Sequence, residues 1–335
     1  MEPHSLLPDF FVYALPPTMA LGASMAFLPY LAERTRMHTL TAMLGIVLAV
    51  ALLGLLHGFG GSVQPVTQWA YGALAMLAAL VVAVPMLDRA RLPGAVAGST
   101  CIAAGILAGI ADAAHPLLPL IARGGWIQAA LMSACIAGLG GSAWVRRHPS
   151  RSKLATRMLA RGQWLMPLAG HVLLAGALGC LALVLEPATS PHAMVIAVIV
   201  AALATLLLAP RPFAMQRIGE SLVAGTLLSL SVTQQPHALI AGGSAALAIL
   251  VGPRLCRALR VDDPARLMGS ILIPSLLGLV LPGIVQENDV HAVGIWAGTA
   301  LACGIAGSVV LWPVVMATLG LRANSRLVRE GMDSF

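Results

Sequence analysis

Charged residues are scarce in this chain, at 10% of 335 residues, whereas hydrophobic residues make up 59%. A water-soluble protein of this length could not cover so much apolar surface with so few charges. No charge-rich stretch is long enough to form a separate soluble domain, and apolar runs of helical length recur from end to end. We therefore expect an all-α membrane protein, with a single polytopic transmembrane domain over residues 1–320 and a short cytoplasmic tail over 321–335.

Motifs of catalysis and metal binding are also lacking. The five cysteines are scattered without a CxxC pair, and there is no phosphate-binding loop, nucleophile elbow or zinc motif. A haem site would need two histidines at matched depth, and only His171 falls deep within an apolar run. These absences predict no enzyme, no metal site and no cofactor.

Basic residues are absent before the first apolar run, where Glu2 and Asp9 are the charged side chains, and no A-x-A cleavage pattern closes the run. We expect a retained first helix and not a signal peptide.

Eleven apolar segments are long enough to cross a membrane as helices. They are expected near residues 10–31, 39–59, 67–87, 94–110, 125–145, 165–185, 192–209, 218–232, 237–255, 267–285 and 290–319, and the last of these is unusually long.

The chain carries a net charge of +7, but its basic residues lie in short loops between apolar segments and do not form a nucleic-acid-binding patch. If alternate loops are cytoplasmic, all of the 20 Lys and Arg residues except Arg123 lie inside, as the positive-inside rule requires. This separation predicts an odd number of helices, an N-terminus outside and a C-terminus in the cytoplasm. We expect a bacterial inner membrane, with the lipid bilayer and not nucleic acid as partner.

Small residues recur at GxxxG spacing, which lets helix backbones approach closely. We expect tight packing within the chain, and a seam between copies of the chain is the alternative. The pairs are Gly54/Gly58, Gly94/Gly98, Gly105/Gly109 and Gly294/Gly298.

A structural loop is indicated at Val261-Asp262-Asp263-Pro264. Asp263 suits the N-cap of the following helix, and Pro264 suits its first position, where the missing N–H is not needed.

At this loop the sequence resembles a known family. The stretch VGPRLCRALRVDDPA over 251–265 is similar to the pattern lGvRll.rl.iDDPvgA of the ammonium transporter (Amt/Mep/Rh) family. Gly320-Leu321-Arg322 and the REGMD run that contains Gly331 resemble the family's tail pattern GLRvs....REGLD, at the same spacing. The run MAFLPYL over 25–31 resembles the first turn, and Ala114-His115 resembles the outer AHW motif. The matches occur in order along nearly the whole chain.

The resemblance implies an Amt-like bundle, with an inverted repeat of helices 1–5 and 6–10 and a long last helix along the outside. It also implies a homotrimer, a PII-type signal protein as a possible cytoplasmic partner, and a channel for ammonium or ammonia.

The conducting residues of the family are replaced in this chain. No histidine stands within 124–131 or at Ile271, where the resemblance places the two pore histidines, and the family's phenylalanine gate falls near Leu74. The aspartate at the start of the fifth helix is missing as well. An ammonium ion would find no aromatic face or imidazole at those positions. The pore-lining candidates are Leu74, Gln128, Ala130, Leu131, His171 and Ile271.

Two functions from different classes stay open. One is an ammonium/ammonia transporter-like channel, impaired for the ion, through which a neutral gas would pass. The other is a non-conducting, Amt-like structural or sensory subunit that docks cytoplasmic partners on its inner loops and tail. An unrelated carrier of the same topology is a third alternative, which the ordered motif matches disfavour.

Overall fold

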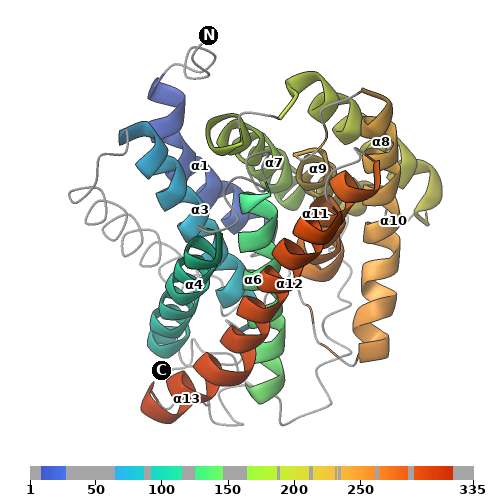
Figure 1. The fold of residues 1–335 in the computed structure, drawn as a ribbon. Coiled ribbons are helices and arrows are strands. Elements are labelled where there is room, and N and C mark those ends of the chain that lie inside the picture. The colour runs from blue at the N-terminus through green and yellow to red at the C-terminus, as the bar shows by residue number, and fades with distance from the viewer. Residues whose placement is uncertain are drawn as a thin grey trace.

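The computed structural model describes residues 9–27, 65–86, 92–114, 125–145, 164–186, 189–210, 214–230, 232, 235–259, 261, 263, 265–285 and 290–319. All regular structure within these ranges is helical, which confirms the all-α prediction (Figure 1). The expected helix near 39–59, Asp262, Pro264 and the tail motifs of Gly320-Leu321-Arg322 and Gly331 lie outside the described residues. The total of eleven helices therefore stays a prediction.

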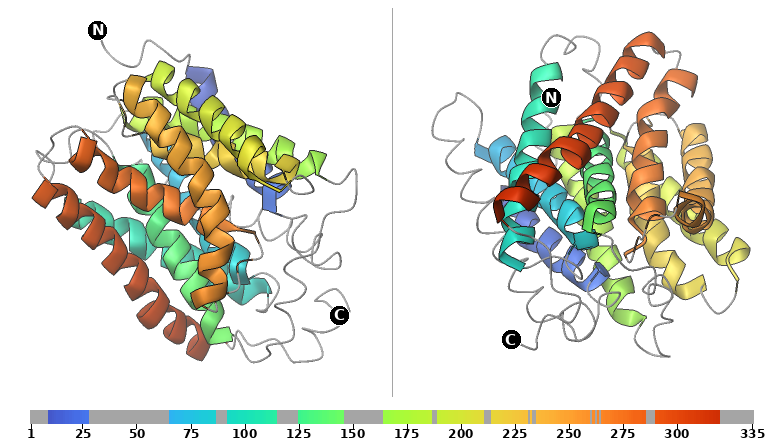
Figure 2. Two further views of the ribbon diagram at one scale, coloured as in Figure 1. Left: turned by 90° about the vertical axis from the view of Figure 1, so that its right-hand side faces the viewer. Right: turned by 90° about the horizontal axis from the view of Figure 1, so that it is seen from below.

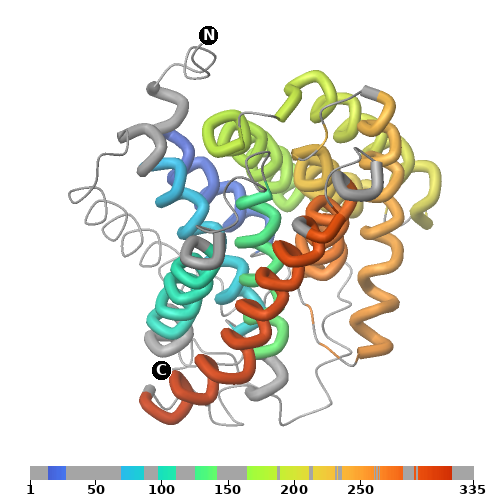
Figure 3. Tube along the Cα trace, in the orientation of Figure 1, coloured from blue at the N-terminus to red at the C-terminus, as the bar shows by residue number. Residues whose placement is uncertain are grey.

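Every other expected segment is a helix, with ends within a few residues of the prediction (Figure 3). The first half holds α1 (Asp9–Phe27), α3 (Pro65–Ala83), η4 (Val84–Met86), α4 (Leu92–Ala114) and α6 (Trp126–Val145). The second half holds α7 (Leu165–Leu185), α8 (Pro191–Leu208), α9 (Ala214–Ser229), α10 (Gln235–Leu259), η8 (Met268–Leu272) and α11 (Ile273–Val285). The chain ends with α12 (Val290–Ala306), η9 (Gly307–Leu311) and α13 (Trp312–Leu319).

Five helical spans in the described ranges are long and apolar enough to cross a membrane, and three further apolar helices are shorter. Lipid offers backbone N–H and C=O groups no hydrogen-bond partner, so a chain of this composition satisfies them within helices. The protein is a multi-pass membrane protein.

Helices from the two halves pack directly on one another. α1 packs most extensively against α7, and α8, α9 and α10 pack against one another. The main core gathers apolar side chains of α3 and α6 with those of α7 and η8. A second core joins α8, α9 and α10 largely through alanine, which allows the close approach typical of membrane helices.

The last helix is a continuous rod of about 45 Å, formed by α12, η9 and α13. Figures 1 and 2 show it along the outside of the bundle. Two polar contacts fasten it to α6: Ser133 donates to the carbonyl of Ala300 at 2.6 Å, and Trp312 donates through Nε1 to the carbonyl of Ala137 at 2.9 Å. The prediction of one long helix near 290–319 is confirmed.

The GxxxG spacings predict close helix packing correctly for some glycines and not for others. Gly98 and Gly109 face side chains of the last helix, as expected. Within the described residues, Gly294 and Gly298 have nothing within 4 Å of an added Cβ, so the prediction of intramolecular packing is wrong for that pair there. A GxxxG spacing identifies a flat helix face but not the surface that covers it.

Candidate functional site

One end of the bundle interior is organised by Glu186, the residue that follows α7. Its side chain is fully buried, and its Oε1 accepts hydrogen bonds from the backbone N–H groups of Gly125 and Ile127, each at 3.1 Å. Gly125 has φ +103°, a left-handed conformation that favours glycine. The first N–H groups of a helix lack intrahelical partners and attract negative charge. Glu186 therefore caps α6 from a different helix.

Burial raises the pKa of Glu186 from 4.5 to about 7, although the hydrogen bonds from the α6 backbone favour the charged form. Its second oxygen, Oε2, is buried and has no hydrogen-bond partner among the described residues. The carboxyl group is thus held between its two protonation states near neutral pH.

Two tryptophans flank this end of α6. The rings of Trp126 and Trp296 meet edge to face with centroids 5.4 Å apart. Trp296 is buried, and its indole nitrogen would lie 3.2 Å from a Cβ added to Gly125. Substituting any larger residue for Gly125 would therefore disturb both its backbone conformation and this contact.

The middle of the bundle is apolar. Leu74 on α3, Ala130 and Leu131 on α6 and Ile271 on η8 are all buried and belong to one core. The structure therefore places four of the six predicted pore-lining residues in the main apolar core. Whether they line a conducting path stays a prediction.

Gln128 is the polar member of this central region. It is fully buried, and its Nε2 donates to the carbonyl of Leu227 on α9 at 3.1 Å. Its Oε1 has no partner in the part of the chain that the structure describes. An added Cβ on Gly278 of α11 would lie 3.3 Å from this side chain. The amide thus joins three helices and leaves one acceptor unpaired.

At the other end of the bundle, Asp263 organises the start of η8. Its carboxylate accepts from the backbone N–H of Leu267 at 2.8 Å and of Met268 at 2.7 Å. Desolvation raises the pKa of Asp263 to about 6, opposed by these two hydrogen bonds.

The predicted geometry of this loop needs a correction. Helical structure begins at Leu267, directly before η8, so Asp263 is not the residue next to the helix start. Arg266 intervenes with φ 57°, in the left-handed region. The Asp263 side chain reaches four and five residues ahead, because the chain turns back between it and η8. Asp263 thus accepts from the first backbone N–H groups of this helix, but Ala265 and Arg266 are not helical, so the helix starts later than the sequence predicts.

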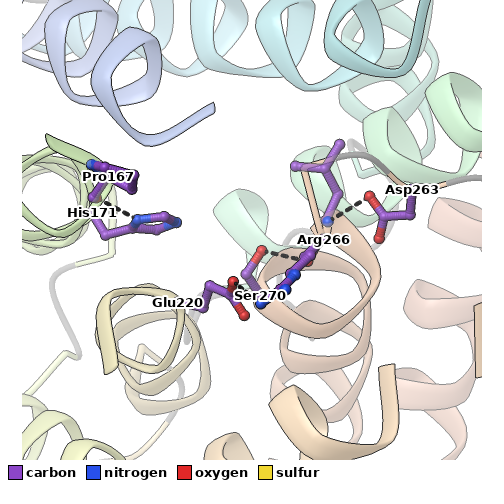
Figure 4. Close-up of polar contacts among 7 residues, drawn as sticks. Pro167, His171, Glu220, Asp263, Arg266 and Ser270 are labelled. Atoms are coloured by element: carbon purple, nitrogen blue, oxygen red, sulfur yellow. Dashed lines mark hydrogen bonds and ion pairs between the residues drawn. The ribbon is translucent and has the colours of Figure 1, made fainter. Parts of the chain in front are cut away.

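A buried ion pair lies beside this loop. Arg266 contacts Glu220 on α9 at 3.0 Å, and Glu220 is 2% exposed (Figure 4). Arg266 also accepts a hydrogen bond from Ser270 through its carbonyl, at 2.9 Å. The pair therefore ties α9 to η8, the segment that carries Ile271.

Replacing one partner of this ion pair should lower the free energy of unfolding more than replacing both partners. We expect Glu220→Gln to lower the free energy of unfolding by about 3 kcal/mol, because it removes the buried anionic partner of Arg266. Adding Arg266→Gln should recover part of that loss. Thermal midpoints of both single variants and the double variant in detergent would test this; additive effects would contradict the coupling.

His171 lies near the ion pair, in the second turn of α7 (Figure 4). It is 1% exposed, as predicted for the one deep histidine. Its Nδ1 lies 2.6 Å from the carbonyl of Pro167, and its ring meets Phe27 of α1 edge to face with centroids 6.1 Å apart. It lies about 22 Å along the axis of α7 from Glu186. Within the described ranges, no group of His, Cys, Asp and Glu side chains could hold a metal ion.

Two site features were missed from the sequence. Glu186 counts there only as an acidic loop residue, and Glu220 interrupts an apolar run without an evident partner. A single acidic residue that directly ends an apolar helix is the one available signal for Glu186.

Comparison with solved structures places this geometry in a known fold. Rh50 of Nitrosomonas europaea aligns with a TM-score of 0.74 at 18% identity, over 95% of this chain and 90% of Rh50. A sensor Amt protein aligns with a TM-score of 0.75 at 14% identity, over 97% of each chain. Mep2 of Saccharomyces cerevisiae aligns with a TM-score of 0.67 at 13% identity, over 95% of this chain and 87% of Mep2. No protein-family model and no curated protein matches the chain.

At these identities the likeness shows the fold. The chain has the Amt/Rh-type helical bundle over nearly its whole length, so the architecture implied by the sequence resemblance is confirmed. Conduction, regulation and assembly do not follow from the fold.

Proposed function

We propose that this protein is a membrane channel that passes ammonia as the neutral gas and is impaired for the ammonium ion. The shared fold with Rh50, whose solved structure concerns conduction by Rhesus channels, supports a channel. The proposed preference for neutral ammonia over the ammonium ion rests on the apolar side chains of the core. They include Leu74, Ala130, Leu131 and Ile271. A cation in that low-dielectric core would have no compensating charge, whereas a neutral molecule avoids that cost.

An assay of internal pH in liposomes tests this proposal. Purified protein would be reconstituted with a trapped pH dye and mixed rapidly with ammonium chloride. Entry of neutral ammonia takes up protons inside, so we expect faster alkalinisation than in empty liposomes. Rates equal to the empty-liposome blank, from protein shown to be folded, would refute the channel.

A second candidate is a non-conducting structural or sensory subunit. It is favoured by the full-length match to a sensor Amt protein and by the burial of Gln128 and Leu131 in the middle of the bundle. Binding of a purified PII-type signal protein to the reconstituted chain would be the test. Binding without ammonia flux would favour this candidate; flux without binding would favour the channel.

For assembly and orientation we propose what the resemblance and the charge bias imply. The protein would be a homotrimer in a bacterial inner membrane, with the N-terminus outside and the C-terminus inside. In this orientation Glu186 lies at the outer end and His171 toward the cytoplasm. Mass measurement of the detergent-solubilised protein would test the trimer.

A further inference from the structure

The imidazole of His171 is fixed in one tautomer by its neighbour on α7. Nδ1 lies 2.6 Å from the carbonyl oxygen of Pro167, and a carbonyl oxygen can only accept a hydrogen bond. Nδ1 therefore carries the proton in the neutral ring. It follows that Nε2 is a bare acceptor.

This acceptor is buried and unpaired. His171 is 1% exposed, and Nε2 has no hydrogen-bond partner in the part of the chain that the structure describes. Buried polar atoms in folded proteins nearly always have a partner, so an exception calls for an explanation. A donor that is not part of the chain would supply one.

Neighbouring residues on α1 and α9 hold the imidazole ring of His171 in place. The edge-to-face contact with Phe27 fixes its plane from the α1 side. On the α9 side the ring lies against Gly219, where an added Cβ would be 3.1 Å from Nδ1. Figure 4 shows the imidazole on the inner side of α7, above Glu220 and across from Arg266. Arg266 donates through one guanidinium nitrogen to Glu220, and no hydrogen bond joins the ion pair to Nε2 within the described residues.

We propose that His171 Nε2 is a binding site for a small, neutral N–H donor, and that in this channel the donor is ammonia. This inference rests on the proposed function for the identity of the ligand. The free nitrogen accepts one N–H bond from ammonia, and no proton is transferred. The site lies in the half of the bundle that contains η8, away from Glu186.

A matched pair of variants separates binding at Nε2 from a structural role of the ring. His171→Asn can keep a donor near the position of Nδ1 and so keep the bond to Pro167, but it removes the nitrogen at the Nε2 position. His171→Gln can place a polar atom near the Nε2 position and gives up the Pro167 bond. We expect Asn to slow ammonia entry about fivefold and Gln to slow it less than about twofold, since one buried hydrogen bond is at stake. The opposite order would overturn the proposal and assign His171 a structural role.

A second measurement does not depend on flux. Protein labelled with ¹⁵N-histidine, in liposomes at mildly alkaline pH, would be titrated with ammonium chloride and followed by solid-state NMR. We expect the resonance of the unprotonated ring nitrogen to shift saturably, and this signal should be missing in His171→Asn. A saturable shift in protein that shows no flux would uphold the site and refute the channel. The absence of any shift would overturn the site, whether or not the protein conducts.

Discussion

Replacing Gly170 with alanine is expected to separate α1 from α7 and to be among the most destabilising single substitutions in the protein. A Cβ at this position would collide with the backbone nitrogen of Ala26 and would lie 2.6 Å from the carbonyl carbon of Met25. The contact is reciprocal, because a Cβ on Gly22 would lie 2.9 Å from the backbone nitrogen of Leu174. Backbone atoms cannot rotate away as a side chain can, so the helices must move apart.

The expected loss is at the upper end of the range for overpacking, about 3 kcal/mol. It should appear as a lower thermal midpoint in detergent and a reduced yield of monodisperse protein. The matched control is Gly176→Ala on the same helix, where an added Cβ meets nothing within 4 Å. Equal midpoints for Gly170→Ala, Gly176→Ala and the unmodified protein would show that α1 and α7 are not in close contact.

The second large effect is a dependence of stability on pH that originates at Glu186. The pKa of this carboxyl group is about 7 in the folded protein, against 4.5 for the ordinary group. The folded state therefore binds the proton more tightly than the unfolded state does. The stability that Glu186 contributes is fully present below pH 4.5 and is lost as the pH rises toward about 7, by about 3 kcal/mol in total.

Substitution of Glu186 by glutamine or by alanine should separate the effect of its charge on stability from the effect of its hydrogen bonds to α6. Glu186→Gln keeps an oxygen for the N–H groups of Gly125 and Ile127, so we expect the pH dependence to weaken and stability at neutral pH to rise. Glu186→Ala should also weaken the dependence, but its stability should lie below that of Glu186→Gln by about 2 kcal/mol at every pH, because two buried donors lose their acceptor.

Thermal midpoints across this pH window would measure both effects. Asp263→Asn is the control for the other capping carboxyl group, whose pKa is about 6 and whose contribution ends at lower pH. A pH profile that Glu186→Gln leaves unchanged would contradict the assignment.

The helices could be predicted because each is a local property of the chain. The run 165–185 is apolar throughout and is bounded by polar residues, and α7 has the predicted ends. The long segment at 290–319 is continuous in the structure for the same reason. Alternation of charge between loops gave the topology prediction, which depends on counts and not on contacts.

The capping of α6 could not be predicted, because it joins residues about 60 positions apart. Its one sequence signal is that Glu186 directly follows an apolar helix, and this does not show that the side chain contacts the N-terminus of α6. Likewise the close contact of Gly22 with α7 depends on which helix faces which. The start of η8 was missed because Arg266 adopts a left-handed conformation that is uncommon for arginine.

The central claim is that the apolar middle of the bundle admits the neutral gas and excludes the ion. The most direct test records transient current on a solid-supported membrane from the same proteoliposomes whose internal pH is followed. Our account predicts alkalinisation above the empty-liposome blank without a current above that blank. A current that rises with ammonium concentration would contradict it, because charge would then cross at Leu74, Leu131 and Ile271 without an imidazole.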